Sequence, residues 1–83
     1  MDFFEELKEK INKKITTENI NIIDKSYLHS KHKSFDSNKY HLKIIINSQK
    51  LRKMEKILAH KEIFSILESE MKNKIHALEI EIK

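Results

Sequence analysis

The sequence predicts one α+β domain over residues 1–83, with the element order α-β-β-α-α-β and a three-stranded mixed sheet that carries its helices on one face. Three observations predict this class. An apolar stripe with helical spacing occupies the first fifteen residues. Two short aliphatic segments, 20–24 and 41–47, favour strands. Near the C-terminal end, Leu78, Ile80 and Ile82 alternate with glutamates, a pattern typical of a half-buried strand.

The first predicted element is a helix that begins after Asp2, whose carboxylate can cap it with Glu5 at the reciprocal position. Its apolar residues recur about every four positions and end near Thr16, namely Phe3, Leu7, Ile11 and Ile15. A short strand follows over 20–24, and the strand over 41–47 is so aliphatic that we expect it inside the sheet. The polar segment between these strands predicts a long loop, which is more often functional than a short one.

Two helices are predicted between the second and third strands. The first rests on the helical spacing of Leu51, Met54 and Leu58. The second rests on a broader stripe of five apolar residues, Ile63, Phe64, Ile66, Leu67 and Met71. Residues 59–61 between the stripes predict a change of direction. We therefore expect His60 at a helix–helix junction, where an imidazole can satisfy free backbone carbonyls and favour a helix C-terminus.

The composition excludes several kinds of site. Without cysteine the chain can form no disulfide, no tetrathiolate zinc site and no iron–sulfur cluster held by this chain alone. Without glycine or proline it has no Gly-rich phosphate loop, and its turns must use Asn, Asp, Ser and Lys. The longest aliphatic run, residues 44–46, is too short to span a membrane, and the acidic N-terminus is unlike a signal peptide. We expect a cytoplasmic protein.

Positive charge is concentrated in the middle of the chain. Residues 25–61 carry ten basic and two acidic residues, whereas residues 1–24 and 62–83 each have a net charge of −2. Such a distribution suggests a surface for nucleic acid or an acidic protein, with a solvated loop and helix face as the alternative. The candidate contact residues are Lys50, Arg52, Lys53, Lys56, His60 and Lys61.

Histidines are the candidate metal ligands. His29 and His32 lie three residues apart in the predicted loop, where they form at most a weak two-ligand site or are ordinary polar loop residues. His41 precedes the second strand, which suggests a structural role at the strand start. His76 opens the last strand and shares the parity of its apolar residues, so it is predicted to point to the buried face. Its place at a strand end would still allow a ring nitrogen to reach solvent or a partner.

From Asp24 onward the chain resembles the BolA family. Residues 24–29, DKSYLH, are similar to the family's D-E-S-x-x-H, and residues 29–32, HSKH, to its H-A-G-H variant. Residues 41–48, HLKIIINS, resemble H-F-x-V-x-[IV]-V-S, and Ala59-His60-Lys61 falls where the family has R-H-R. Leu67, Glu70 and the IHAL segment 75–78 match L-x-x-E-L…[IV]-H-A-L. The resemblance covers roughly residues 19–82 and departs at 51–53, where LRK replaces F-x-G.

This resemblance implies a class II KH-like fold and a non-enzymatic function. BolA-like proteins pair with monothiol glutaredoxins and share a [2Fe–2S] cluster, to which the glutaredoxin cysteine and glutathione contribute thiolates. The BolA side contributes a loop histidine and the histidine of I-H-A-L. By position these are His29 and His76, with His32 as the alternate loop ligand. The simplest state is a monomer that forms a heterodimer with its partner and holds no cluster when alone.

Two other functions follow less directly. Family members have been discussed as transcriptional regulators, which makes DNA an alternative partner for the basic 50–61 region. A KH domain, however, binds nucleic acid through a GxxG loop, and this chain has no glycine and no evident aromatic platform for stacked bases. Catalysis has the least support, because the chain lacks a cysteine nucleophile, a serine elbow and an HExxH motif. The closeness of Asp24, Ser26 and His29 in sequence does not create triad geometry.

Overall fold

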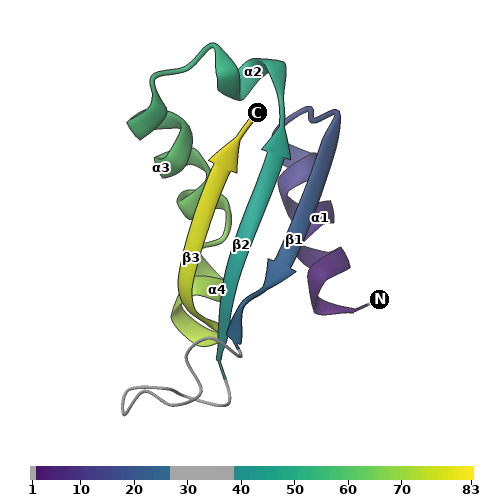
Figure 1. Ribbon diagram of the computed structural model, residues 1–83, viewed down its shortest axis with the longest axis vertical. Helices are drawn as coiled ribbons and strands as arrows, with labels where there is room; N and C mark the ends of the chain where they lie inside the picture. Colours follow the sequence, from purple (N-terminus) through teal and green to yellow (C-terminus); the bar gives the residue numbers. More distant parts are fainter. Residues whose placement is uncertain (1, 27–38) are drawn as a thin grey trace.

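The structure of the protein is a computed structural model, and it describes residues 2–26 and 39–83 (Figure 1). Its elements in chain order are α1 (Phe3–Lys14), β1 (Asn19–Asp24), β2 (Tyr40–Asn47), α2 (Gln49–Arg52), α3 (Lys56–Ile66), α4 (Glu68–Asn73) and β3 (Ile75–Ile82). The sheet has the order β1-β2-β3, with β1 antiparallel and β3 parallel to β2. The predicted α+β class with a mixed three-stranded sheet is therefore confirmed.

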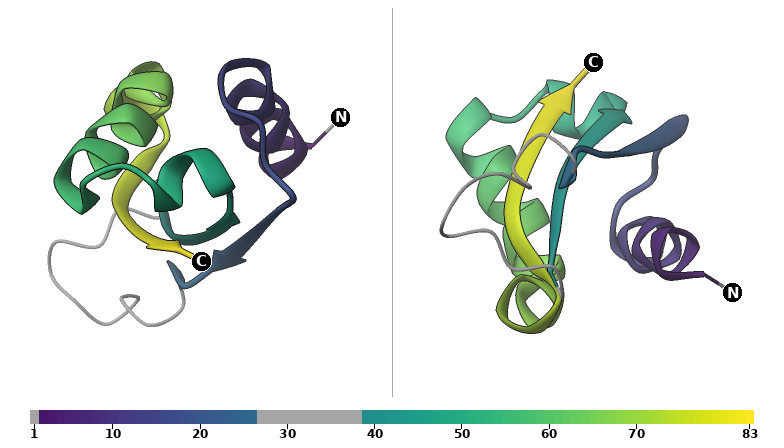
Figure 2. Two further views of the ribbon diagram at one scale, coloured as in Figure 1. Left: turned by 90° about the horizontal axis from the view of Figure 1, so that it is seen from above. Right: turned by 60° about the horizontal axis from the view of Figure 1, so that its bottom comes forward.

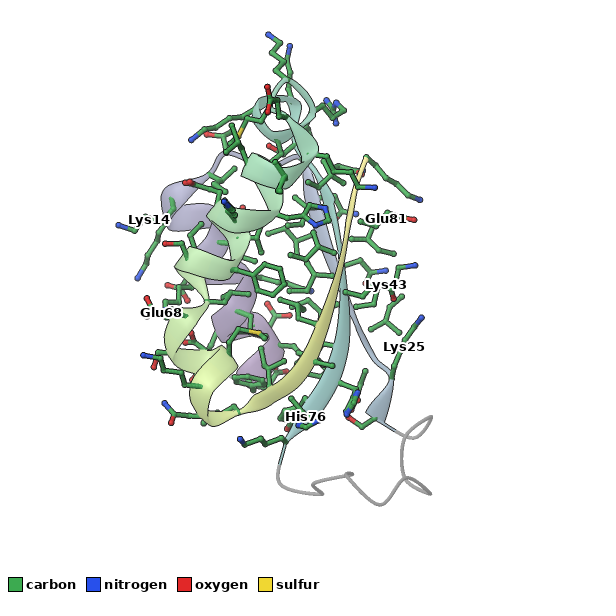
Figure 3. All side chains as sticks on the ribbon, turned by 90° about the vertical axis from the view of Figure 1, so that its left-hand side faces the viewer. Lys14, Lys25, Lys43, Glu68, His76 and Glu81 are labelled. Carbon is green, nitrogen blue, oxygen red and sulfur yellow. The ribbon has the colours of Figure 1, made fainter. Side chains whose placement is uncertain are left out.

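The helices cover one face of the sheet, as the two further views show (Figure 2). The core lies between these layers and is almost entirely aliphatic; its fully buried side chains include Leu7, Ile11, Ile44, Ile46, Ile63 and Leu67. The opposite face of the sheet carries charged side chains that point away from the helices (Figure 3). On that face Lys25 pairs with Glu79 at 3.5 Å and Lys43 pairs with Glu81 at 3.9 Å.

Helix α1 begins directly after Asp2, as predicted. Asp2 caps the helix, since its Oδ1 accepts a hydrogen bond of 2.8 Å from the backbone N–H of Glu5. The helix leaves α-geometry at Ile15, whose side chain is buried. The first turn of the helix is anchored by aromatic packing, because the Phe3 ring stacks on Tyr40 at the start of β2 with 5.1 Å between centroids.

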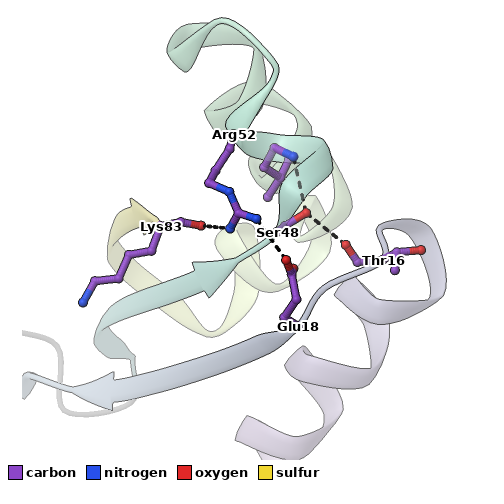
Figure 4. A network of polar contacts seen from close by, with 6 residues as sticks. Thr16, Glu18, Ser48, Arg52 and Lys83 are labelled. Carbon is purple, nitrogen blue, oxygen red and sulfur yellow. Dashed lines mark hydrogen bonds and ion pairs between the residues drawn. The ribbon is translucent and has the colours of Figure 1, made fainter.

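The helices between β2 and β3 differ from the prediction. Ser48 caps α2, accepting a hydrogen bond from the N–H of Leu51 (3.3 Å) and donating one to the Thr16 carbonyl (2.9 Å) (Figure 4). This short helix ends at once, and α3 then runs without interruption through residues 59–61. The predicted change of direction there is wrong; the helical segments instead meet at residues 53–55 and at Leu67. His60 consequently lies within α3 and not at a helix junction, so the predicted carbonyl-capping role is also wrong.

The chain makes its turns without glycine. The C-cap of α2, Lys53, has φ −82°, and no residue in the described ranges has a positive φ. After β1, Asp24 Oδ1 accepts a hydrogen bond of 2.9 Å from the N–H of Ser26, an Asx-type turn of the predicted kind. The departure from F-x-G at residues 51–53 therefore leaves the start of α3 without backbone strain. No helix within the described ranges is long and apolar enough to cross a membrane.

Candidate metal centre

His76 lies in an irregularity at the start of β3. Tyr40 pairs with Ile75, but the next residue of β2, His41, pairs with Ala77, so His76 is an additional residue on β3. A bulge of this kind leaves the added residue outside the regular ladder and redirects its side chain. Ile75 is buried, whereas His76 is exposed at the end of the sheet where β2 begins (Figure 3).

The prediction that His76 points to the buried face of the sheet is wrong for this reason. The additional residue interrupts the alternation, so Ile75, and not His76, shares the helix-covered face with Leu78 and Ile80. Sequence periodicity cannot detect such a shift, because it depends on which residue of β2 lies opposite. The register shift leaves the His76 side chain accessible to solvent.

His41 is the neighbour of His76 across the strands. The centroids of the two imidazole rings lie 5.0 Å apart, with 37° between the ring planes. Unlike His76, His41 is only 8% exposed. Its backbone N–H donates to Ser26 Oγ at 3.1 Å, and its carbonyl accepts from the N–H of Lys25 at 2.7 Å. The sequence predicted a strand-start residue here; the contact with His76 was missed because it depends on the parallel pairing of β2 with β3.

The donor set within the described ranges is small. In residues 2–26 and 39–83, no three His, Asp or Glu side chains are grouped as a metal site. One exposed imidazole cannot hold a metal ion by itself, since stable sites use three or four ligands. Within these ranges the chain therefore offers no complete ligand set for a metal ion.

The other two predicted ligands, His29 and His32, lie outside the described residues. The described residues on either side of their segment, Ser26 and Tyr40, are hydrogen-bonded to residues close to His76. Ser26 accepts the hydrogen bond from His41, and the N–H of Tyr40 donates to the Lys74 carbonyl at 2.9 Å. The described residues on both sides of this segment thus lie near the end of the sheet that carries the exposed imidazole.

The predicted partner surface lies at the other end of the sheet, on α2 and α3. Arg52 is committed to internal contacts: its guanidinium pairs with Glu18 at 3.0 Å and donates to the Lys83 carbonyl (Figure 4). The Arg52 hydrogen bond is the main cause that lowers the pKa of the Glu18 carboxyl. The four lysines of this surface form no ion pair with any residue that the structure describes, namely Lys50, Lys53, Lys56 and Lys61.

His60 borders a cleft of about 620 Å³ between α3 and β3. Arg52 and Lys56 contribute positive charge to this cleft, while Glu79 and Glu81 of β3 contribute negative charge. The cleft is therefore of mixed charge. The β3 residues that border this cleft are 79–82, toward the end of the strand, whereas His76 lies at its start (Figure 3).

Comparison with known proteins identifies the family. The family model of BolA-like proteins matches residues 11–83. A BolA-like protein from Dictyostelium discoideum is 37% identical over 76 residues, which cover 90% of this chain and 64% of that protein. The chain thus spans less than two thirds of the length of this relative.

Solved structures agree with the sequence comparison. The BolA domain of SufE1 from Arabidopsis thaliana is 26% identical with a TM-score of 0.81, and the match covers 100% of this chain and 93% of that one. BolA1 from Arabidopsis thaliana is 25% identical with a TM-score of 0.82, covering 100% and 92%. A bol-like protein from Babesia bovis, 16% identical with a TM-score of 0.74 and coverage of 99% and 84%, shares the fold. The resemblance that the motifs indicated is confirmed, and the chain belongs to the BolA family.

Proposed function

We propose that this protein is a non-enzymatic adaptor that binds a monothiol glutaredoxin and shares a [2Fe–2S] cluster with it, in iron–sulfur trafficking or iron regulation. The observation that carries the proposal is the exposed imidazole of His76, which the register shift turns out of the sheet at the family's I-H-A-L position. Membership of the BolA family supports the same function.

Each side of the complex would supply the ligands that the other lacks. This chain has no thiolate to offer, so the thiolates would come from the glutaredoxin cysteine and from glutathione. His76 would bind through a ring nitrogen. Imidazole ligation of an iron–sulfur cluster raises its reduction potential above that of an all-thiolate cluster.

The second imidazole would come from His29, with His32 as the alternate. His29 follows Ser26 by three residues, which limits their Cα separation to about 11 Å in any conformation. Ser26 is in turn held against the backbone of His41, whose ring contacts His76. His32 follows Ser26 by six residues, so its greatest possible separation is about twice as large, and it stays the alternate ligand.

Reconstitution of the complex with a monothiol glutaredoxin and glutathione tests the proposal. Visible absorption and circular dichroism report the cluster ligands, and the rate of cluster loss to a chelator reports retention. We expect His76→Ala to change the dichroism and to lower retention by at least the roughly 10- to 100-fold that loss of an outer-shell partner costs. Comparison of His29→Ala with His32→Ala identifies the loop ligand.

His60→Ala is the matched control, because it removes a partly exposed imidazole from α3 outside the candidate centre. It should leave the spectrum and the retention unchanged. Unaltered spectra and retention in both His76→Ala and His29→Ala would show that the cluster assignment is wrong.

A further inference from the structure

We propose that His41 is a positioning residue, whose buried ring packs against His76 and holds that imidazole in one orientation. The importance of this orientation for a metal rests on the proposed function. The contact itself does not, because it is present in the chain alone, with the two ring centroids 5.0 Å apart.

Burial separates the roles of the two histidines. The His76 side chain is exposed, so its ring can meet a ligand that a partner brings. Both ring nitrogens of His41 are shielded from solvent, so neither can reach a metal on a partner without a rearrangement of the strands. His41 is therefore suited to support His76 and not to replace it as a ligand.

Backbone bonds on two sides hold His41 in place. Its N–H donates to Ser26 Oγ and its carbonyl accepts from Lys25, while on the other side it pairs with Ala77. A bulged residue such as His76 is outside the regular ladder and does not gain its orientation from cross-strand pairing. Without a neighbouring ring, its side chain is free to distribute among the staggered rotamers. A centroid distance of 5.0 Å is within the range of favourable aromatic contacts, so the His41 ring provides the missing constraint.

The test uses the chain alone and measures the side-chain rotamers of His76 by nuclear magnetic resonance, from three-bond couplings and ring chemical shifts. His41→Leu removes the ring but keeps an apolar side chain. His41→Phe keeps a ring, and the hollow of about 160 Å³ bordered by His41 and Ala77 leaves room for its larger size. Ile44→Val is the matched control, because it trims a fully buried residue of the same strand on the helix-covered side.

We expect one dominant His76 rotamer in the wild type, His41→Phe and Ile44→Val, and averaging over the staggered wells in His41→Leu. The proposal is overturned if His41→Leu retains the wild-type couplings. It is also overturned if Ile44→Val averages to the same extent, since the effect would then be a general loosening of the strand.

A second measurement tests whether the orientation of His76 affects retention of the cluster. In the complex with glutaredoxin and glutathione, His41→Leu should lose its cluster on the order of 10-fold faster than the wild type, and His41→Phe should restore retention. If His76→Ala lowers retention but His41→Leu does not, His41 does not position the ligand and the inference fails. If His76→Ala and His29→Ala both leave retention unchanged, the proposed function fails, and the rotamer measurement still decides whether His41 orients His76.

Discussion

His76 faces solvent because one added residue changes which side chains of β3 point toward the helices. The residue before it, Ile75, is buried, and the apolar alternation resumes only after Ala77. That residue 76 is a histidine explains why it can bind a metal. Its exposure to solvent comes from the register shift of β3 between Tyr40 and His41 of β2. The bulge thus exposes the imidazole while the aliphatic residues Ile75 and Ile80 of the same strand stay buried.

At the other end of the sheet, Arg52 pairs with Glu18 and lowers the pKa of its carboxyl. The hydrogen bond from Arg52 lowers the pKa of this carboxyl, and the nearby positive charge lowers it further. We expect Arg52→Met to raise the pKa of Glu18 toward its ordinary value, as measured by a ¹³C titration of the carboxyl group. Since the folded-state pKa is depressed, the pair stabilises the fold at neutral pH, and this contribution is lost as the pH falls through the folded-state pKa of Glu18.

The effect on stability should be small and sensitive to salt, because both side chains are largely exposed. Lys13→Met is the control; it removes the Lys13–Glu9 pair on α1 and should leave the titration of Glu18 unchanged. An unaltered Glu18 pKa in Arg52→Met would contradict the assignment.

Among the elements, α3 shows where apolar periodicity misleads. Its buried residues Ala59 and Ile63 follow helical spacing and continue to Leu67. Leu58, which belongs to the predicted first stripe, is 49% exposed. The predicted stripe joins Leu51 of α2 and Met54 of the connection to Leu58 of α3. Because the helix is interrupted between them, their spacing does not indicate which face of α3 is buried.

We expect the two apolar positions of α3 to respond differently to truncation. Ile63→Ala should lower the free energy of unfolding by about 2–5 kcal/mol, because it opens a cavity in the core. Leu58→Ala should change it by no more than about 0.5 kcal/mol, as at other surface sites. Denaturant unfolding with an unchanged m-value measures both. Equal losses in the two variants would show that α3 buries a different face.

At the scale of the whole molecule, two surfaces of the described residues differ in whether their lysines have ionic partners. On the open face of the sheet, lysines are neutralised by glutamates of β3. Around α2 and α3, four lysines have no ionic partner among the described residues, which is the one structural feature that favours the alternative nucleic-acid function. Arg52 adds less to this surface than its charge suggests, because Glu18 neutralises it.

We expect any binding of duplex DNA to be electrostatic and without sequence preference. The logarithm of the association constant should fall linearly with log salt, by about 0.9 per phosphate neutralised. Replacement of the four lysines by glutamine, Lys50→Gln, Lys53→Gln, Lys56→Gln and Lys61→Gln together, should remove most of this slope in an electrophoretic titration.

The matched control changes lysines of α1, Lys8→Gln, Lys13→Gln and Lys14→Gln, and should retain the slope. A preference for one duplex sequence that persists at higher salt would contradict the expectation and support a regulatory function. Absence of any retardation at low salt would remove the alternative.

The fold class, the three strands and the start of α1 were predictable from the chain alone. Each rests on a local signal: period-two or aliphatic runs for the strands, and Asp2 three residues before Glu5 for the helix start. The BolA motifs likewise identified His76 as the candidate ligand before any geometry was known. Composition alone established that this chain can supply no thiolate ligand.

Only the tertiary structure decided which way these residues face. The exposure of His76, its contact with His41 and the inward face of α3 all depend on pairing or packing between segments far apart in sequence. The apolar periodicity of a sequence is a property of one segment. It cannot indicate that a strand contains an additional residue relative to the strand with which it pairs. The sequence by itself determined that the chain offers imidazole without thiolate; the register between β2 and β3 decided that His76 presents it.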